Sequence, residues 1–422
     1  MGHILLLIYS LLAPVIAGLY AVFFLFSPRR SLMKSLGGEL KERLGLVPAS
    51  EGPRPVWIHA ASLGEVKAIS KLAPELSAAF KAPLLITSST ASGRAEGAKL
   101  GAARLAPLDF YFSAANFIKK NNPLMLVVAE TEIWPATLYA AARAGVPVFM
   151  VNARISQKTL GLYKVLGPLT RLAFSGVKQV LAQTEADAER FRGLSGLKDK
   201  VQTTGNLKYD LLGVSPAGQD QVRHFFEASD WGDAPVFTAG STHPEEEPVV
   251  IQAWLEARKA VPGLKLVLVP RHPEKLFASE AVLKERGAAF MRWSSALVPE
   301  ATDCLIVDAM GLLQAFYSAS AVCFVGGTLD NTGGHNLLEP ALFSKPALFG
   351  PNYGNARHAG DALIKEKGGF LVETAPQLAA KLSELLTDTP ALQAARSSAA
   401  KTLSGLRGAT AKTVSTITSA VS

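Results

Sequence analysis

The chain has 422 residues, of which 49% are hydrophobic and 18% charged, and its formal net charge at pH 7 is +8. This length favours two domains over one, and the absence of a dense basic run argues against a nucleic-acid-binding protein. Cys304 and Cys323 both lie in apolar runs, which argues against a disulfide framework or a cysteine metal cluster.

The first predicted element is a membrane anchor. Residues 4–26 contain no charged side chain, and a helix of about 20 residues is long enough to cross the hydrocarbon core of a bilayer. Arg29, Arg30 and Lys34 follow, so the positive-inside rule places the rest of the chain in the cytoplasm. We expect residues 1–28 to anchor the protein, across the membrane or from one face. A buried core helix is the alternative.

Apolar runs typical of buried strands alternate with helical patterns along the rest of the chain. The predicted strands lie at residues 56–60, 83–89, 124–130, 146–153, 179–184, 234–241, 265–271, 304–309, 321–327, 346–351 and 369–373. Helical patterns lie between them, for example at 64–80 and 135–145, and the tail after Pro390 also has helical spacing. This alternation predicts parallel sheets with helices on both faces.

A break in the alternation predicts the domain boundary. Residues 211–220 are rich in Gly, Ser and Pro and are predicted to form a linker. We therefore predict an α/β fold with two Rossmann-like domains at residues 29–212 and 213–422, the second closed by C-terminal helices. Polar residues follow nearly every predicted strand, and ligands bind at the carboxyl ends of parallel strands. Two sites facing one cleft are the expected result.

Carboxylates are the candidate catalytic groups of the first domain. Glu65 stands at the start of a predicted helix, whose dipole is expected to keep it ionised, either as a helix cap or as a base. Glu130 ends an apolar run and needs a partner or a raised pKa if it is buried. Lys208 is a candidate partner, and a solvated linker lysine is the alternative. Glu132 is interpreted as a helix cap and His59 as a locally packed side chain.

The second domain is predicted to bind an anion. Backbone N–H groups of residues 240–242, at a predicted helix start, could hold a phosphate, and the Arg271 guanidinium suits phosphate. The glycine-rich loop at residues 326–334 precedes a predicted helix from Asn336, in which Glu339 could hold a ribose diol. The sequence has neither a P-loop nor a compact G-x-G-x-x-G motif. No His, Asp and Glu set has the sequence spacing of a metal site, so we expect no metal.

Seven short segments then indicate a family. They are WIHAASLGEV, ETEIWP, GNLKYD, GSTHPEEE, VPRHPEK, MGLLQAFY and GGTLDNTGGHNLLEPA, in this order behind the apolar N-terminus. Together they resemble the 3-deoxy-D-manno-octulosonic acid (Kdo) transferases of lipopolysaccharide synthesis, over nearly the whole chain. The resemblance implies the glycosyltransferase B fold, an acceptor-binding first domain and a second domain that binds CMP-Kdo. It also implies inversion at the anomeric carbon without a cofactor or catalytic metal.

The resemblance implies roles for individual residues. Glu65 matches the general base of the family, and Glu130 and Lys208 match residues that support the transition state. The CMP-binding segments match Pro270, Arg271 and His272, then Met310, Gly311 and Leu312, then Asn336, Leu337, Leu338 and Glu339. The chain departs from many relatives at Leu312, where an acid is common, and at Lys158 and Thr159, where serine is common.

The expected function is transfer of Kdo from CMP-Kdo to the lipid A precursor (lipid IVA) on the cytoplasmic face of the bacterial inner membrane. Two alternatives remain at this point. One is another membrane-anchored enzyme with the same fold, such as a different glycosyltransferase or a sugar-nucleotide epimerase. The other is a non-catalytic membrane scaffold that binds nucleotide. An epimerase needs no lipid acceptor or anchor, and a scaffold needs no exposed acid such as Glu65.

Overall fold

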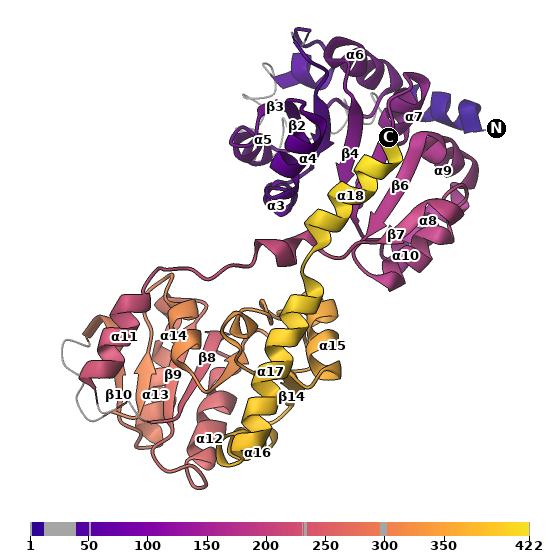
Figure 1. Ribbon diagram of the computed structural model, residues 1–422. Coiled ribbons are helices and arrows are strands. Elements are labelled where there is room, and N and C mark those ends of the chain that lie inside the picture. The colour runs from indigo at the N-terminus through magenta and orange to yellow at the C-terminus, as the bar shows by residue number, and fades with distance from the viewer. Residues whose placement is uncertain are drawn as a thin grey trace. The chain divides into compact units, whose positions relative to one another are not determined.

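The computed structural model describes residues 2–11, 39–49, 52–229, 231, 234–295 and 302–421. The chain divides into two compact units, Met1–Leu211 with Arg407–Ser422, and Leu212–Leu406 (Figure 1). Each unit contains one seven-stranded sheet, and every pair of neighbouring strands is parallel. The prediction of two parallel α/β domains is therefore confirmed.

The sheet of the first unit has the strand order β3-β2-β1-β4-β5-β6-β7. Its strands are β1 (Val56–His59), β2 (Leu84–Ser88), β3 (Ala102–Leu105), β4 (Met125–Ala129), β5 (Val148–Ala153), β6 (Val177–Ala182) and β7 (Val201–Thr203). The helices are α3 (Leu63–Ala68), α4 (Leu72–Phe80), α5 (Ala91–Gly97), α6 (Tyr111–Asn121), α7 (Pro135–Arg143), α8 (Gln157–Val165), α9 (Gly167–Ala173) and α10 (Glu185–Arg192). Trp57 belongs to one hydrophobic cluster and its neighbours Val56 and Ile58 to another. Because alternate strand residues face opposite sides, both faces of β1 are buried, which explains its continuous apolar run.

The sheet of the second unit has the order β10-β11-β9-β8-β12-β13-β14. Its strands are β8 (Val236–Thr242), β9 (Lys265–Pro270), β10 (Phe290–Arg292), β11 (Cys304–Ile306), β12 (Val322–Val325), β13 (Ala347–Phe349) and β14 (Gly369–Leu371). The helices are α11 (Gln219–Ala228), α12 (Glu247–Ala257), α13 (Phe277–Glu285), α14 (Leu313–Ala319), α15 (Arg357–Lys365), α16 (Ala375–Thr387) and α17 (Thr389–Leu406). Cys304 and Cys323 are buried and not disulfide-bonded, as predicted.

All eleven predicted strands are present, and three observed strands were not predicted. These are β3, β7 and β10, which have four, three and three residues. β3 and β10 form sheet edges, and β7 forms the remaining edge of the first sheet. Each is only partly buried, so none has the continuous apolar run by which a central strand is identified.

The last helix, α18 (Ala409–Val421), corrects the predicted domain division, because it belongs to the first unit and not to the second. Ala409 and Ile417 are fully buried in a hydrophobic cluster of the first unit. The Asp210 carboxylate accepts hydrogen bonds from the backbone N–H groups of Gly408 and Thr410, both at 2.6 Å. The chain therefore returns to its first unit at the C-terminus, where α18 is drawn in yellow among β4, β6 and α4 (Figure 1).

Most of the predicted membrane anchor lies outside the described residues, because residues 12–38 are not among them. Residues 2–11 are helical. Leu6 of this helix is buried against Ala136 and Leu169, and the Tyr9 hydroxyl donates to Asp109 at 2.9 Å. Across the described ranges, no helix has both the length and the apolar character that crossing a membrane requires.

Candidate functional site

Each sheet has a central position where the strand order reverses direction. In the first unit the reversal lies between β1 and β4, and in the second between β8 and β12. Ligands of open parallel sheets bind at such a position, beyond the carboxyl ends of the strands. The segments that follow β1 and β4 contain Glu65 and Glu130, and those that follow β8 and β12 contain His243 and the glycine-rich loop. The strand order thus selects the segments that also carried the sequence motifs.

Glu65 is held at the N-terminus of α3 by both of its carboxylate oxygens. The Ala61 N–H donates to Oε2 at 2.8 Å, and the Ser62 hydroxyl donates to Oε1 at 2.9 Å. Ser62 is also the N-cap of the helix. These two contacts fix the orientation of a carboxylate that remains partly exposed. The predicted position of Glu65 at the head of a helix is confirmed.

Burial raises the pKa of Glu65 above its ordinary value, although the hydrogen bonds from Ala61 and Ser62 lower it. This direction differs from the expectation that the helix dipole alone would favour the ionised form. A carboxylate with a raised pKa holds a proton more tightly and is a stronger base, and the ideal pKa of a general base lies near the operating pH. The local structure therefore favours a role in proton transfer more than the sequence suggested.

Glu130 lies directly after β4 and is paired with two cations. Only 6% of the residue is exposed. Its Oε1 is 2.9 Å from Lys208 Nζ, and its Oε2 is 3.0 Å from Arg154. The predicted partnership with Lys208 is confirmed, and Arg154 was not predicted as a partner. A buried carboxylate with two charged partners is compensated, so Glu130 is better suited to orient these cations than to accept a proton.

Two strained residues position this group. Glu130 has φ +56° and Asn152, within β5, has φ +51°. Residues other than glycine rarely adopt this left-handed backbone conformation, and such strain is concentrated at functional sites. The buried Asn152 side chain accepts the N–H of Leu207 at 3.0 Å, which fixes the segment that carries Lys208.

Glu132 adds a third carboxylate. Its pKa is raised, first by burial and then by the charge of Glu65. Its interpretation as a helix cap is wrong, because its carboxylate accepts the Trp134 indole N–H at 2.7 Å. The N–H groups of the first turn of α7 are instead bonded by Asp109, through Ala136 and Thr137. Glu132 thus joins Glu65 and Glu130 in one group of carboxylates, in which the ion pairs of the described residues with Lys208 and Arg154 are both made by Glu130.

His59 packs locally, as predicted. It is buried, its Nδ1 lies 3.0 Å from the Thr87 hydroxyl, and its ring meets Trp134 edge to face. Burial lowers the pKa of His59 to about 4, so the imidazole is neutral at pH 7.

In the second unit, Arg271 and His272 follow β9 at the carboxyl edge of the sheet. The Arg271 backbone N–H donates to the Thr242 carbonyl at 2.9 Å, while the residue itself is exposed. The charge of Arg271 contributes to a lowered pKa of His335, of which burial is the largest cause. The charge of Arg271 therefore acts on His335, which directly follows the glycine-rich loop.

Glu246 is the residue of this unit that the sequence did not single out. It is buried, and its two oxygens accept backbone N–H groups at 2.6–3.3 Å from His243, Gly327, Thr328 and Leu329. Burial raises the pKa of Glu246 to about 7, against these hydrogen bonds. The side chain fixes the glycine-rich loop to the turn after β8. Its position in the acidic run GSTHPEEE was the only available signal.

Two predicted helix starts in this unit are wrong. Residues 240–242 belong to β8, and α12 begins only at Glu247. After the glycine-rich loop, the described chain forms a 3-10 turn, Pro340–Phe343, in place of an α-helix from Asn336. The Asn336 side chain accepts the Leu338 N–H and donates to Glu339, both at 3.2 Å. Local bonds of this kind compete with helical ones.

The predicted CMP-binding residues differ in what they can present to a ligand. Met310 is 71% exposed, and burial raises the pKa of the half-buried Glu339. The side chains of four others are buried in the core, namely Pro270, Leu312, Leu337 and Leu338. These four can contact a ligand through the backbone only, so the unusual Leu312 fills core space. Gly311, with φ +87°, provides the turn before α14.

Comparisons with known proteins agree with these observations. Residues 38–211 match the family described as 3-deoxy-D-manno-octulosonic-acid transferase (kdotransferase). A 3-deoxy-D-manno-octulosonic acid transferase of Bordetella pertussis is 32% identical over 375 residues, which cover 85% of this chain and 86% of that protein. The chain belongs to the Kdo transferase family.

Other similarities are more limited. A bifunctional glycosyltransferase/methyltransferase of Fusobacterium nucleatum is 31% identical over 75% of this chain. The match covers 50% of that longer protein. The crystal structure of UDP-GlcNAc 2-epimerase from Neisseria meningitidis has a TM-score of 0.58 at 17% identity, covering 86% of this chain and 99% of that one. The epimerase is similar in fold alone. The chain is a glycosyltransferase of the Kdo transferase family with two parallel-sheet α/β domains.

Proposed function

We propose that this glycosyltransferase moves Kdo from CMP-Kdo to the lipid A precursor, with inversion at the anomeric carbon and without a catalytic metal or cofactor. The observation that carries the proposal is Glu65, a partly exposed carboxylate held by two hydrogen bonds, with a raised pKa, beside a compensated Glu130–Lys208 pair. Inversion in one displacement needs a single base on the acceptor side.

In this mechanism Glu65 accepts the proton of the acceptor hydroxyl while that oxygen bonds to the anomeric carbon. The bond from the anomeric carbon to the CMP phosphate breaks, and its electron pair leaves with the phosphate. Lys208 and Arg154, held by Glu130, supply positive charge beside the reacting acceptor. Arg271 stabilises the departing phosphate, because a cation placed where charge develops lowers the barrier.

The test is direct analysis of the product. Purified protein is incubated with CMP-Kdo and lipid IVA, and the lipid is weighed by mass spectrometry. We expect a mass gain of one or more Kdo units, and a chelator such as EDTA should leave the rate unchanged. Lack of a Kdo-containing lipid would overturn the assigned reaction. A large loss of rate with EDTA would instead show that the reaction uses a metal.

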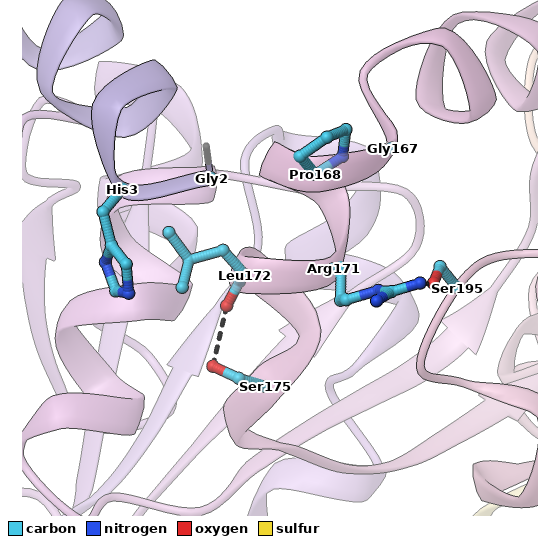
Figure 2. Close-up of a pocket in the computed structure, with 8 residues that line it drawn as sticks. All are labelled: Gly2, His3, Gly167, Pro168, Arg171, Leu172, Ser175 and Ser195. Atoms are coloured by element: carbon cyan, nitrogen blue, oxygen red, sulfur yellow. Dashed lines mark hydrogen bonds between the residues drawn. The ribbon is translucent and has the colours of Figure 1, made fainter.

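We also propose that the first unit docks on the cytoplasmic face of the inner membrane. Several large apolar side chains are exposed on neighbouring elements of this unit, namely Ile4, Leu7, Ile8, Leu11, Phe112, Leu162 and Val165. A cavity of about 640 Å³ adjoins the helix at residues 2–11, and His3 and Arg171 are among the residues that line it (Figure 2). Apolar side chains beside basic groups are typical of interfacial membrane binding.

Sedimentation with anionic phospholipid vesicles tests this docking. Phe112 and Val165 are 80% and 82% exposed, so serine substitutions should leave the fold unchanged. The double variant Phe112→Ser/Val165→Ser should bind vesicles at least about a hundredfold more weakly, because each apolar side chain that enters the bilayer contributes roughly 1.5–3 kcal/mol. The control is Phe277→Ser, which removes a similarly exposed side chain from the second unit (74%). Equal vesicle binding by both variants would contradict the proposal that this surface of the first unit binds the membrane.

A further inference from the structure

Two loops of the second unit bring together a group of ligating side chains that the proposed reaction does not use. His243 and Glu245 lie in the turn after β8, and Asp330 lies in the glycine-rich loop after β12. One nitrogen or oxygen atom from each of the three lies within 4.8 Å of the others. His243 and Asp330 are largely buried, with side-chain exposures of 15% and 13%. The fold brings Asp330 close to His243, although 87 residues separate the two in the sequence.

The distance between His243 and Asp330 is typical of two ligands on one metal ion. Nδ1 of His243 and Oδ2 of Asp330 are 3.5 Å apart, which is longer than the roughly 2.7–3.2 Å of an N–H···O hydrogen bond. Zinc bonds to nitrogen and oxygen are about 2.0–2.2 Å long, so two tetrahedral ligands lie about 3.4 Å apart. The pair therefore fits a shared ion better than a direct hydrogen bond.

Both ligands are held by second partners, as metal ligands usually are. Nε2 of His243 lies 2.9 Å from Nε2 of His335. When His243 donates this hydrogen bond, its Nδ1 lone pair is directed toward Asp330. The carboxylate of Asp330 accepts the backbone N–H and the hydroxyl of Thr332, at 2.9 and 2.8 Å. These contacts orient both groups before an ion binds.

The charges of the group favour a divalent cation. Glu245 and Asp330 provide two carboxylates, which a dication neutralises, and His243 provides a neutral imidazole. A mixed nitrogen and oxygen set binds Zn²⁺ more tightly than Mn²⁺, whereas Mg²⁺ prefers oxygen ligands and retains its waters.

We propose that His243, Glu245 and Asp330 form a binding site for one divalent transition-metal ion, with Zn²⁺ preferred. The ion links the turn after β8 to the glycine-rich loop, and Glu246 joins the same two segments through hydrogen bonds. The proposal is independent of the proposed reaction, because no step of the transfer passes through the ion and turnover does not require it.

Calorimetric titration of chelator-treated, tag-free full-length protein with Zn²⁺ tests the site. We expect one ion per chain. Asp330→Asn and Glu245→Gln, which keep the side-chain size, should each weaken binding at least tenfold, and His335→Ala should weaken it 10- to 100-fold as the loss of a supporting partner. The matched control is Glu274→Gln, an exposed carboxylate on the same edge of this unit, which should bind Zn²⁺ like the parent.

Two further measurements make the outcome decisive. Zn²⁺ should raise the melting temperature of the parent, because a ligand of the folded state stabilises it, and it should do so less for Asp330→Asn. Glu245 is exposed, so Glu245→Gln decides the matter even where Asp330→Asn loses its fold. The proposal is overturned if the parent binds no Zn²⁺, or if Glu245→Gln binds it as tightly as the parent does.

Discussion

Glu65→Gln should lower turnover roughly a hundredfold or more, which is the scale of a lost general base. Glutamine keeps the size of the side chain and one acceptor oxygen but takes up no proton at neutral pH. The loss of a helix-terminal charge alone costs only about 0.3–1 kcal/mol of stability, so the variant should melt only slightly earlier. CMP affinity should remain at the parent level, since the proposed donor residues lie on the second unit.

The measurement is turnover with CMP-Kdo and lipid IVA, alongside melting temperature and CMP affinity. A matched control is Glu75→Gln, because Glu75 lies in the first turn of the next helix, α4, and is not part of the carboxylate cluster. Near-parent turnover in Glu65→Gln would reduce Glu65 to a helix-end charge. Glu132, whose pKa is also raised by burial, would then be the next candidate for the base, because Glu130 is held by two cations.

The pH dependence of turnover provides a second test of Glu65. Because burial raises its pKa, turnover should increase with pH through a midpoint above the 4.5 of an ordinary glutamate, and this limb should be lost in Glu65→Gln. The contribution of Glu65 to the stability of the fold changes with pH in the opposite direction. A raised pKa in the folded state means that the neutral form stabilises the fold, so this contribution is complete below pH 4.5 and is lost as pH rises through the folded-state pKa.

The sequence was informative wherever a feature depends on neighbouring residues. The apolar runs of the central strands, the small-residue turn before Glu65 and the proline that opens α7 all act within a few positions. The pairing of Lys208 with Glu130 was also predicted, although 78 residues separate them. That inference needed only the cost of burying a carboxylate without a partner.

Features that depend on strand order could not be predicted in the same way. Glu246 bonds to Gly327, 81 residues away, because β12 lies next to β8 in the sheet, and no local pattern encodes that adjacency. The same adjacency brings Asp330 to His243, so a search for metal-ligand spacing along the sequence missed this pair. Likewise, the helical spacing of α18 predicts a helix but not the unit on which it packs. The hydrogen bonds accepted by Asp210 and the burial of Ala409 determine that α18 packs on the first unit.

Arg271→Ala should weaken CMP binding by about 1.5–3 kcal/mol, the usual contribution of a hydrogen bond to a charged group. This corresponds to roughly a 10- to 150-fold higher Kd. The fold should be retained, because the residue is exposed and its contact with Thr242 is made by the backbone N–H. Arg271→Lys should bind CMP with intermediate affinity, since lysine keeps the charge but loses the planar two-pronged contact with phosphate.

Calorimetry with CMP distinguishes this specific contact from a general loss of positive charge. Arg286→Ala is the matched control, because it removes an exposed arginine at the end of α13 in the same unit and should leave the affinity unchanged. Equal weakening by both substitutions would mean that net charge alone attracts the nucleotide. Unchanged affinity in Arg271→Ala would mean that the phosphate is bound elsewhere. The glycine-rich loop held by Glu246 would then be the first segment to test, because its backbone is fixed beside the same strand ends.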